Sequence, residues 1–177
     1  TRVQVLEPVL ARHRGKTFYV TEKLDGTSFT AFLRDGQFGV CSRNLWLDET
    51  DDASTLVRLA KRLGLADRLR AVREGRGFWP AVQGEVIGPG IQGNKYGLAE
   101  VALRVFTVLD LDAGRSVPHA DQLAVLADMG LEPVPQLGTL VLDHGVDELV
   151  KLSVGTSVLN PKAQREGIVL RPLAEED

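Results

Sequence analysis

The sequence is poor in the residues that most often build disulfides and metal centres. It has one cysteine and three histidines among 177 residues. Because Cys41 is alone, an internal disulfide is excluded, and we expect a reducing, cytoplasmic setting. His13, His119 and His144 are scattered along the chain with no cysteine beside them, so a zinc site is not expected.

Long apolar runs are also missing. No stretch approaches the roughly 20 apolar residues that a membrane-spanning helix needs. The chain opens Thr-Arg-Val-Gln, without the pattern of a secretory signal peptide. Hydrophobic residues make up 44% and charged residues 25% of the sequence, which is ordinary for a globular protein. The length predicts a single domain over residues 1–177.

Charge gives a mixed indication about nucleic acid. The formal net charge is −3, whereas proteins that bind nucleic acid are often basic. Residues 58–76 nevertheless form a basic stretch in which cations far outnumber Asp67 and Glu74. Its cations are Arg58, Lys61, Arg62, Arg68, Arg70, Arg73 and Arg76. The stretch is either a contact for phosphates or the solvated face of a helix, and the sequence leaves both open.

Hydrophobic periodicity and turn signals predict an α+β fold with antiparallel sheets, because hairpins and late helices do not alternate regularly. Asp35-Gly36 is a hairpin signal, and Asp51 or Asp52 is expected to cap the first long helix. Strands are expected over 17–21, 27–33, 38–42, 79–87, 103–111 and 168–170. Helices are expected over 7–14, from the Asp51-Asp52 cap to Gly64, from there to Arg73, and over 119–129 and 146–152.

A glycine-rich segment over 88–96 matches the dinucleotide-binding pattern G-x-G-x-x-G. It follows a predicted strand, and Asp110 stands about twenty residues further on. A dinucleotide-binding turn must open a helix of several turns, however, and the next strand is expected near Leu103. Pro89 also removes a backbone donor from the supposed phosphate cradle. An oxidoreductase is therefore a weak alternative.

The segment Glu22-Lys23-Leu24-Asp25-Gly26 carries the chemistry of greatest interest. A lysine amine is a nucleophile when it is unprotonated. In an extended chain Lys23 and Asp25 project to one side. Gly26 permits a ligand to approach the backbone closely and permits an unusual φ. A plain surface turn between two strands is the alternative for this short pattern alone.

Four further segments follow in order: Ser42-Arg43-Asn44, Gln83–Gly88, Val108-Leu109-Asp110 and Arg165–Arg171. With the lysine segment, they resemble the motifs of the covalent nucleotidyltransferases, the superfamily of polynucleotide ligases and mRNA capping enzymes. The longer stretches 18–28 and 83–94 are similar to ATP-dependent RNA ligases of the Deinococcus type. The resemblance runs from about residue 16 to residue 172 and implies an ATP-grasp-like nucleotidyltransferase domain of antiparallel sheets flanked by helices.

The resemblance implies three phosphoryl transfers assisted by Mg²⁺ or Mn²⁺. Lys23 attacks ATP to form lysyl-AMP, AMP passes to a 5′-phosphate end, and a 3′-hydroxyl seals the strand. The substrates implied are ATP and RNA ends or nicked RNA/DNA duplexes, as in RNA repair. Glu166 and Asp25 are the metal-binding candidates, because carboxylate oxygens suit these ions.

The remaining nucleotide-binding positions also come from the resemblance. Glu22 lies beside the adenine with Asp25 and Gly26 nearby, Arg43 contacts the sugar and later the phosphate, and Glu85 binds the ribose. Leu109 takes the purine-stacking position, where many relatives have phenylalanine. Phe106 is three residues earlier and should face the other way on a regular strand. Nucleic-acid contacts are expected at Arg58, Lys61, Arg62, Asn94 and Lys95.

Two departures from the family pattern leave alternatives open. No lysine-bearing strand follows Arg171, and the N-terminal OB domain of the Deinococcus-type enzymes is missing, so a trimmed core is expected. The chain could then be a non-catalytic fragment that binds adenylate or nucleic acid. A DNA ligase core or a capping-enzyme core shares the same chemistry. The ligase interpretation requires Lys23, Arg43, Glu85 and Glu166 to line one nucleotide cavity.

Overall fold

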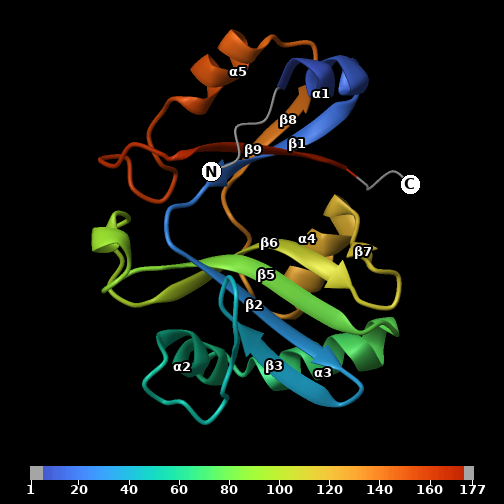
Figure 1. Cartoon of the computed structure of the whole chain (residues 1–177), viewed down its shortest axis with the longest axis vertical. Helices are drawn as coiled ribbons and strands as arrows, with labels where there is room; N and C mark the ends of the chain where they lie inside the picture. The colour runs from blue at the N-terminus through green and yellow to red at the C-terminus, as the bar shows by residue number, and fades with distance from the viewer. Residues whose placement is uncertain (1–5, 174–177) are drawn as a thin grey trace. The chain divides into compact units, whose positions relative to one another are not determined.

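The fold is taken from a computed structural model, which describes residues 6–173 (Figure 1). The expected α+β class with antiparallel sheets is confirmed. Contacts divide the described chain into two compact units. Unit 1 combines the N-terminal segment through Leu24 with Pro135–Leu173, and unit 2 is Asp25–Val134. The expectation that they form a single domain stays a prediction, and each unit is described by itself.

Unit 1 is built on a three-stranded antiparallel sheet with the order β8-β1-β9. Its elements are α1 (Leu6–His13), β1 (Thr17–Lys23), β8 (Gln136–Val141), α5 (Val146–Ser153) and β9 (Gly167–Pro172). Threonine, valine and aromatic residues favour the strand β1, whose two edges are both paired. This central place holds the strand firmly, and Lys23 is its last residue.

Unit 2 is built on a six-stranded antiparallel sheet with the order β4-β3-β2-β5-β6-β7. Its strands are β2 (Thr27–Arg34), β3 (Gln37–Cys41), β4 (Trp46–Leu47), β5 (Pro80–Ile87), β6 (Ala102–Asp110) and β7 (Arg115–Ser116). The predicted hairpin turn between β2 and β3 is confirmed: Asp35 and Gly36 have φ of 50° and 78°. Positive φ at both central residues matches the twist of the flanking strands.

Three helices and the sheet of unit 2 enclose its hydrophobic core. The helices are α2 (Thr55–Arg62), α3 (Leu65–Arg76) and α4 (His119–Asp128). Their apolar residues pack with Phe29, Val82 and Val105 of the sheet. Figure 1 shows α2 and α3 running beside β2 and β3. Strand residues between the buried ones therefore point to the opposite face of the sheet.

The predicted cap of α2 is wrong. Ser54, not Asp51 or Asp52, precedes the helix, and its hydroxyl accepts a hydrogen bond from the Val57 backbone nitrogen at 3.4 Å. Asp51 instead accepts from the Ala53 nitrogen at 2.9 Å, which closes the turn before the helix. Aspartate and serine both satisfy such donors, so the sequence could not separate the two roles.

A bulge in β6 changes the direction of one aromatic side chain. Gln83 and Gly84 of β5 pair with Thr107 and Val105, which leaves Phe106 as the extra residue. Val105 and Val108 are both buried in the core. Phe106 and Leu109, each next to one of these valines, therefore lie on the same face, opposite to the core. The expectation that they face opposite ways is wrong because the strand is irregular.

The glycine-rich segment does not open a helix of several turns. Only a short 3₁₀ turn, η1 (Gln92–Asn94), lies between β5 and β6. The dinucleotide-binding alternative is therefore wrong. Among the described helices, none is long and apolar enough to cross a membrane.

Candidate functional site

Unit 1 brings Lys23 and Glu166 together. The side-chain amine of Lys23 donates a hydrogen bond to Oε1 of Glu166, and the two groups form an ion pair. The pairing of β1 with β9 explains the contact, because Lys23 stands opposite Gly167. The lysine side chain is 50% exposed and the glutamate 37%, so both can meet a ligand. An amine held by a carboxylate at a partly open surface suits a nucleophile that must be oriented.

Arg165 fixes the chain just before Glu166. Its Nε donates to the Ser153 carbonyl at 2.8 Å, and its guanidinium also donates to the carbonyls of Leu152 and Val154. These carbonyls lie at the C-terminal end of α5, where helical carbonyls need outside donors. The Arg165 backbone nitrogen donates to the Gly155 carbonyl at 2.9 Å. Glu166 therefore lies on a segment whose backbone is held in place by hydrogen bonds of Arg165.

Glu22 lies in the interior of unit 1 and is only 1% exposed. Its Oε2 accepts a hydrogen bond from the Val158 backbone nitrogen at 2.8 Å. Its Oε1 is buried and has no hydrogen-bond partner among the described residues. Its backbone nitrogen donates to the Pro135 carbonyl at 2.9 Å. The side chain thus ties the segment before Glu166 to β1, a role that the resemblance did not indicate.

Unit 2 places Glu85 and Leu109 on one face of its sheet. Glu85 lies between the buried residues Gly84 and Val86, and Leu109 follows the buried Val108. Strand alternation turns both side chains away from the core. Glu85 stands opposite Ser28 of β2 on one side and Arg104 of β6 on the other. The face carries one carboxylate together with the apolar side chains of Leu109 and Phe106.

Gly26 is required by packing, not by an unusual φ. Its φ is not in the positive range, in contrast to the sequence-based expectation. A Cβ at this position would stand 2.3 Å from the Val86 carbonyl oxygen and 2.8 Å from Cγ2 of Ile87. It would also stand 3.0 Å from Cγ of Glu85. Only glycine therefore lets the segment after Lys23 lie directly against β5 near Glu85.

Asp25 is held by the glycine-rich loop. Its backbone nitrogen donates to the Tyr96 hydroxyl oxygen at 2.7 Å, and its carboxylate lies 3.7 Å from Nζ of Lys95. Asn94 uses its side-chain amide within the loop, on the backbone of Leu98. Lys95 and Asn94, expected to contact nucleic acid, therefore both have partners in unit 2.

Arg43 lies in the tight connection between β3 and β4. The Ser42 backbone nitrogen and the Leu45 carbonyl close this connection with a hydrogen bond of 2.9 Å. Arg43 is exposed. A guanidinium in this position is open to a phosphate or a sugar. Whether Arg43 and Glu85 share a cavity with Lys23 and Glu166 concerns both units and stays a prediction.

The cations of the basic stretch 58–76 are used within unit 2. On α3, Arg68 donates to the carbonyls of Met129 and Gly130, and Arg76 pairs with Asp128. These contacts tie α3 to the end of α4, as expected for arginines that satisfy helix-terminal carbonyls. The other pairs are Arg70 with Asp67, Arg73 with Asp112 and the Trp79 ring, Lys61 with Asp52, and Arg62 with Glu100.

The predicted nucleic-acid contacts on α2 do line a cavity. A cavity of about 590 Å³ lies between α2 and the segment 89–101, and its lining includes Arg58, Lys61 and Arg62. Two of these cations already pair with carboxylates, Lys61 with Asp52 and Arg62 with Glu100. A phosphate would have to compete with these acids, and exposed pairs of this kind are weak enough to exchange.

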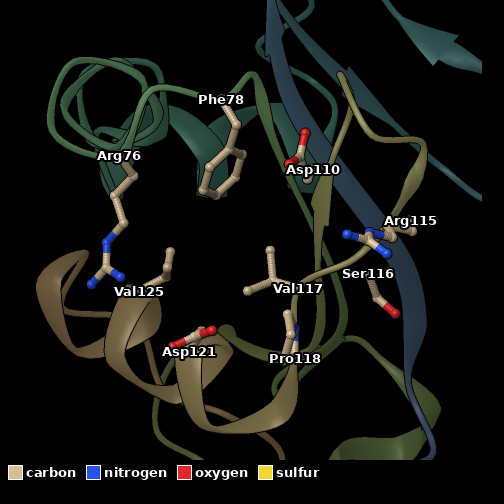
Figure 2. A pocket seen from close by; sticks show the side chains of 9 residues that line it. All are labelled: Arg76, Phe78, Asp110, Arg115, Ser116, Val117, Pro118, Asp121 and Val125. Atoms are coloured by element: carbon tan, nitrogen blue, oxygen red, sulfur yellow. The ribbon is translucent and has the colours of Figure 1, made fainter. Parts of the chain in front are cut away.

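A second cavity lies at the end of β6 and is not part of the Glu85 face. Figure 2 shows Phe78, Val117 and Val125 directed into this space of about 270 Å³, with Asp110 at its edge. Val125 belongs to the core, and Phe78 and Val117 pack against it. The Asp110 carboxylate accepts hydrogen bonds from the backbone nitrogens of Asp112 and Ala113, at 2.9 and 3.0 Å. Asp110 therefore shapes the turn after β6.

The carboxylates fit a metal ion only in part. Within residues 6–173, no group of three or more histidine, cysteine or acidic side chains could hold a metal ion alone. Mg²⁺ in phosphoryl-transfer sites commonly uses one or two carboxylates and completes its shell with water and substrate phosphates. The partly exposed carboxylates of Glu166 and Asp25 fit that mode, and each has a lysine partner that an ion would replace.

Tyr96 and Arg165 are the site-supporting residues that the sequence analysis missed. Tyr96 lies 71 residues after its partner Asp25 and is a lone aromatic among glycines. A buried tyrosine in a loop does signal a hydrogen-bonded hydroxyl, although not its partner. Arg165 directly precedes the predicted metal ligand, and nothing in the sequence indicates that it binds the end of α5.

Comparisons with known proteins identify the family of the chain. The sequence profile of the RNA ligase family matches residues 16–177. A mutant of the Naegleria gruberi RNA ligase with ATP and Mn is 31% identical, covers 99% of this chain with a TM-score of 0.91, and is itself covered over 52%. The same ligase with PPi is 32% identical, with a TM-score of 0.89 over 97% of this chain and 51% of that one.

A further mutant of that ligase, with AMP and Mn, is 31% identical over 98% of this chain and 51% of its own, with a TM-score of 0.89. The chain spans about half the length of these solved relatives. A comparison with curated protein sequences finds no significant match. The family profile and the structural similarity both extend over nearly all of the sequence. The chain therefore belongs to the RNA ligase family.

Proposed function

We propose that the chain is the adenylation core of an ATP-dependent RNA ligase. The Lys23 amine loses a proton and forms a bond to the α-phosphorus of ATP, while the bond to the β-phosphate oxygen breaks and pyrophosphate leaves. An oxygen of a 5′-phosphate then displaces Lys23 from AMP. Finally a 3′-hydroxyl attacks that 5′-phosphate, releases AMP and joins the strands.

The observation that carries the proposal is the hydrogen bond between Lys23 and Glu166. It joins the predicted nucleophile, at the end of β1, to the predicted metal ligand, just before β9, although the sequence separates them widely. The solved relatives support the same chemistry, since their structures contain ATP, AMP or PPi, in two cases with Mn. In this account Glu166 orients the amine. Correct placement of the nucleophile next to the phosphorus atom supplies much of the catalysis in phosphoryl transfer.

The nucleotide contacts follow from the faces already described. Glu85 binds the ribose hydroxyls, and Leu109 covers the purine with apolar surface. Phe106 lies on the same face of β6, so it is a second candidate for contact with the base. Arg43 binds the sugar and then the phosphate with its exposed guanidinium. Glu22 acts on the adenine side by holding the Val158 segment in place.

The proposed protein ligands for Mg²⁺ or Mn²⁺ are the carboxylates of Glu166 and of Asp25, each completed by phosphate oxygens and water. When bound, such an ion neutralises the charge that develops on the transferred phosphate. The residues of the chain then have two tasks. The ion pair between Glu166 and Lys23 must break so that the lysine amine is free to react. Lys95 must also leave the Asp25 carboxylate, so that the metal ion can replace it as the partner of that carboxylate.

The proposed macromolecular partners are RNA ends or nicked RNA/DNA duplexes, in a cytoplasmic protein. The cavity beside α2 supports a phosphate contact at Arg58, Lys61 and Arg62. Asn94 and Lys95 belong to the same proposed surface, although their first role is internal. Family membership favours RNA ligase over a DNA ligase or capping-enzyme core.

A binding fragment without turnover is the second candidate, because the chain covers only about half of its solved relatives. Transfer of radiolabelled AMP separates the two. The chain is incubated with α-labelled ATP and Mn²⁺, freed of nucleotide, and mixed with an RNA that has a 5′-phosphate. An adenylation core passes its label to the RNA. A binding fragment holds no label after denaturing removal of nucleotide.

A further inference from the structure

The glycine-rich loop between β5 and β6 has an unusual backbone. Three consecutive residues, Gln92, Gly93 and Asn94, have φ of 45°, 65° and 51°. The left-handed region is unfavourable for a non-glycine residue, because its Cβ comes too close to the following carbonyl oxygen. Two such residues, separated only by Gly93, persist only where the surrounding contacts dictate the conformation, and such positions gather at functional sites.

The loop is closed by its own hydrogen bonds. The Asn94 side chain donates to the Leu98 carbonyl at 2.9 Å and accepts from the Leu98 nitrogen at 3.0 Å. Backbone bonds of 2.8 Å join Asn94 to Ile91 and Gly97 to Asn94. The two residues after the left-handed turn, Lys95 and Tyr96, are therefore presented in a fixed direction.

Three side chains of this loop contact the two residues that follow the Lys23-Leu24 pair. The Tyr96 hydroxyl oxygen accepts from the Asp25 nitrogen at 2.7 Å, and Tyr96 is only 4% exposed. Nζ of Lys95 is 3.7 Å from Oδ2 of Asp25. The Gln92 amide donates to the Gly26 carbonyl at 3.5 Å. The backbone and the carboxylate of Asp25 are thus held by different residues.

We propose that Tyr96 and Lys95 are positioning residues for the adenylation reaction, an inference that rests on the proposed function. Lys23 ends β1, in which residues 18–21 pair with both neighbouring strands and Lys23 itself pairs with Gly167 of β9. Tyr96 fixes Asp25, only two residues further along. The nucleophile is therefore restrained on both sides along the chain, with Leu24 alone between it and the fixed point. The Lys95 amine holds the Asp25 carboxylate in one orientation until a ligand takes the place of Lys95.

Phenylalanine at position 96 tests the backbone restraint. Tyr96→Phe keeps the buried ring but removes the oxygen that accepts from the Asp25 nitrogen. The loss of one hydrogen bond corresponds to about a five- to tenfold rise in amide exchange at that position. Exchange is measured by NMR on the full chain without nucleotide. Tyr19→Phe, which changes the other tyrosine, is the matched control and should leave the exchange of the Asp25 amide as in the wild type.

The rate of lysyl-AMP formation tests the consequence. At saturating ATP, the single-turnover rate should fall about tenfold in Tyr96→Phe and in Lys95→Met, because small misplacements of reacting groups are costly. The half-saturating ATP concentration should stay within about twofold, since neither residue binds ATP in this account. Lys95→Arg keeps the charge next to Asp25 and should restore most of the rate.

The results separate this inference from the proposed function. Unchanged exchange of the Asp25 amide in Tyr96→Phe would overturn the restraint, whatever the activity. Faster exchange with an unchanged adenylation rate would overturn the positioning role. If the wild type itself forms no lysyl-AMP, the proposed function fails, and with it the positioning role, while the exchange measurement still decides whether Tyr96 restrains Asp25.

Discussion

The side-chain amine of Lys23 donates a hydrogen bond to the carboxylate of Glu166 across 143 positions of sequence. Pairing of β1 with β9 produces this contact, and hydrogen bonds from Arg165 to the end of α5 hold the glutamate in place. Because both side chains are partly exposed, the pair contributes little to stability. Its importance lies in the direction that it gives to the amine.

Glu166→Gln should separate activity from stability. The amide keeps the shape and one oxygen acceptor but removes the charge that pairs with Lys23 and attracts a metal ion. We expect lysyl-AMP formation to slow on the order of 100-fold, while the free energy of unfolding changes by less than about 1 kcal/mol. Rates by gel shift and urea unfolding curves check the two effects. Glu49→Gln, at an exposed turn, is the control; an equal loss of activity there would count against the assignment.

Gly26→Ala should destabilise the protein through a steric clash. The new methyl group would stand 2.3 Å from the Val86 carbonyl oxygen, so β5 or the segment after Lys23 must move. The expected cost is about 1–3 kcal/mol in the free energy of unfolding. Gly75→Ala is the matched control, because this glycine lies in α3 with nothing within 4 Å of a new Cβ. The control should gain up to about 1 kcal/mol. Equal effects in both variants would refute the packing argument for Gly26.

His119 should make stability depend on pH. Burial lowers the pKa of His119 below its ordinary value of 6.5, because the charged imidazolium loses water. Between the folded and unfolded pKa values, the unfolded chain binds more protons, so the free energy of unfolding falls as pH falls through this window below 6.5. His119→Gln should flatten that fall. Urea unfolding at a series of pH values checks it, and identical slopes in the two proteins would contradict the burial effect.

Charge reversal on α2 should impair sealing but not adenylation. Lys61→Glu with Arg62→Glu breaks two exposed pairs, which are worth about 1 kcal/mol or less each. Both residues line the cavity beside α2, so RNA binding should weaken and its dependence on salt should decrease. Arg70→Glu reverses one charge on α3, outside this cavity, and serves as the control for each of the single variants Lys61→Glu and Arg62→Glu. If only the control variant loses RNA binding, the RNA contact lies outside α2 and the prediction is wrong.

Local patterns predicted most of the fold. The strand Thr27–Arg34 alternates buried and half-buried residues, and α4 follows a helical repeat, so both were expected near their observed bounds. The strand β8 (Gln136–Val141) was not predicted. It contains Gly138 and is largely exposed, so it lacks apolar alternation, and its pairing with β1 depends on a contact far away in sequence.

The candidate site was predictable where the sequence carries motifs that resemble those of the covalent nucleotidyltransferases. Lys23 and Glu166 were expected from the ordered motifs, and the structure joins them. The hydrogen bonds of Tyr96 with Asp25 and of Arg68 with the end of α4 were not predictable. Both join a side chain to a backbone group, and the sequence does not indicate which backbone group is used. The direction of Phe106 was misjudged because a bulge interrupts the alternation on which such predictions depend.

Covalent attachment of AMP to Lys23 tests the central claim most directly. The chain is incubated with ATP and Mn²⁺, and its intact mass is compared with those of Lys23→Ala and Lys151→Ala, which removes an exposed lysine on α5. We expect the wild type and Lys151→Ala to gain the mass of one AMP, and Lys23→Ala to gain none. An adduct that persists in Lys23→Ala would show that another residue carries AMP and would contradict the account.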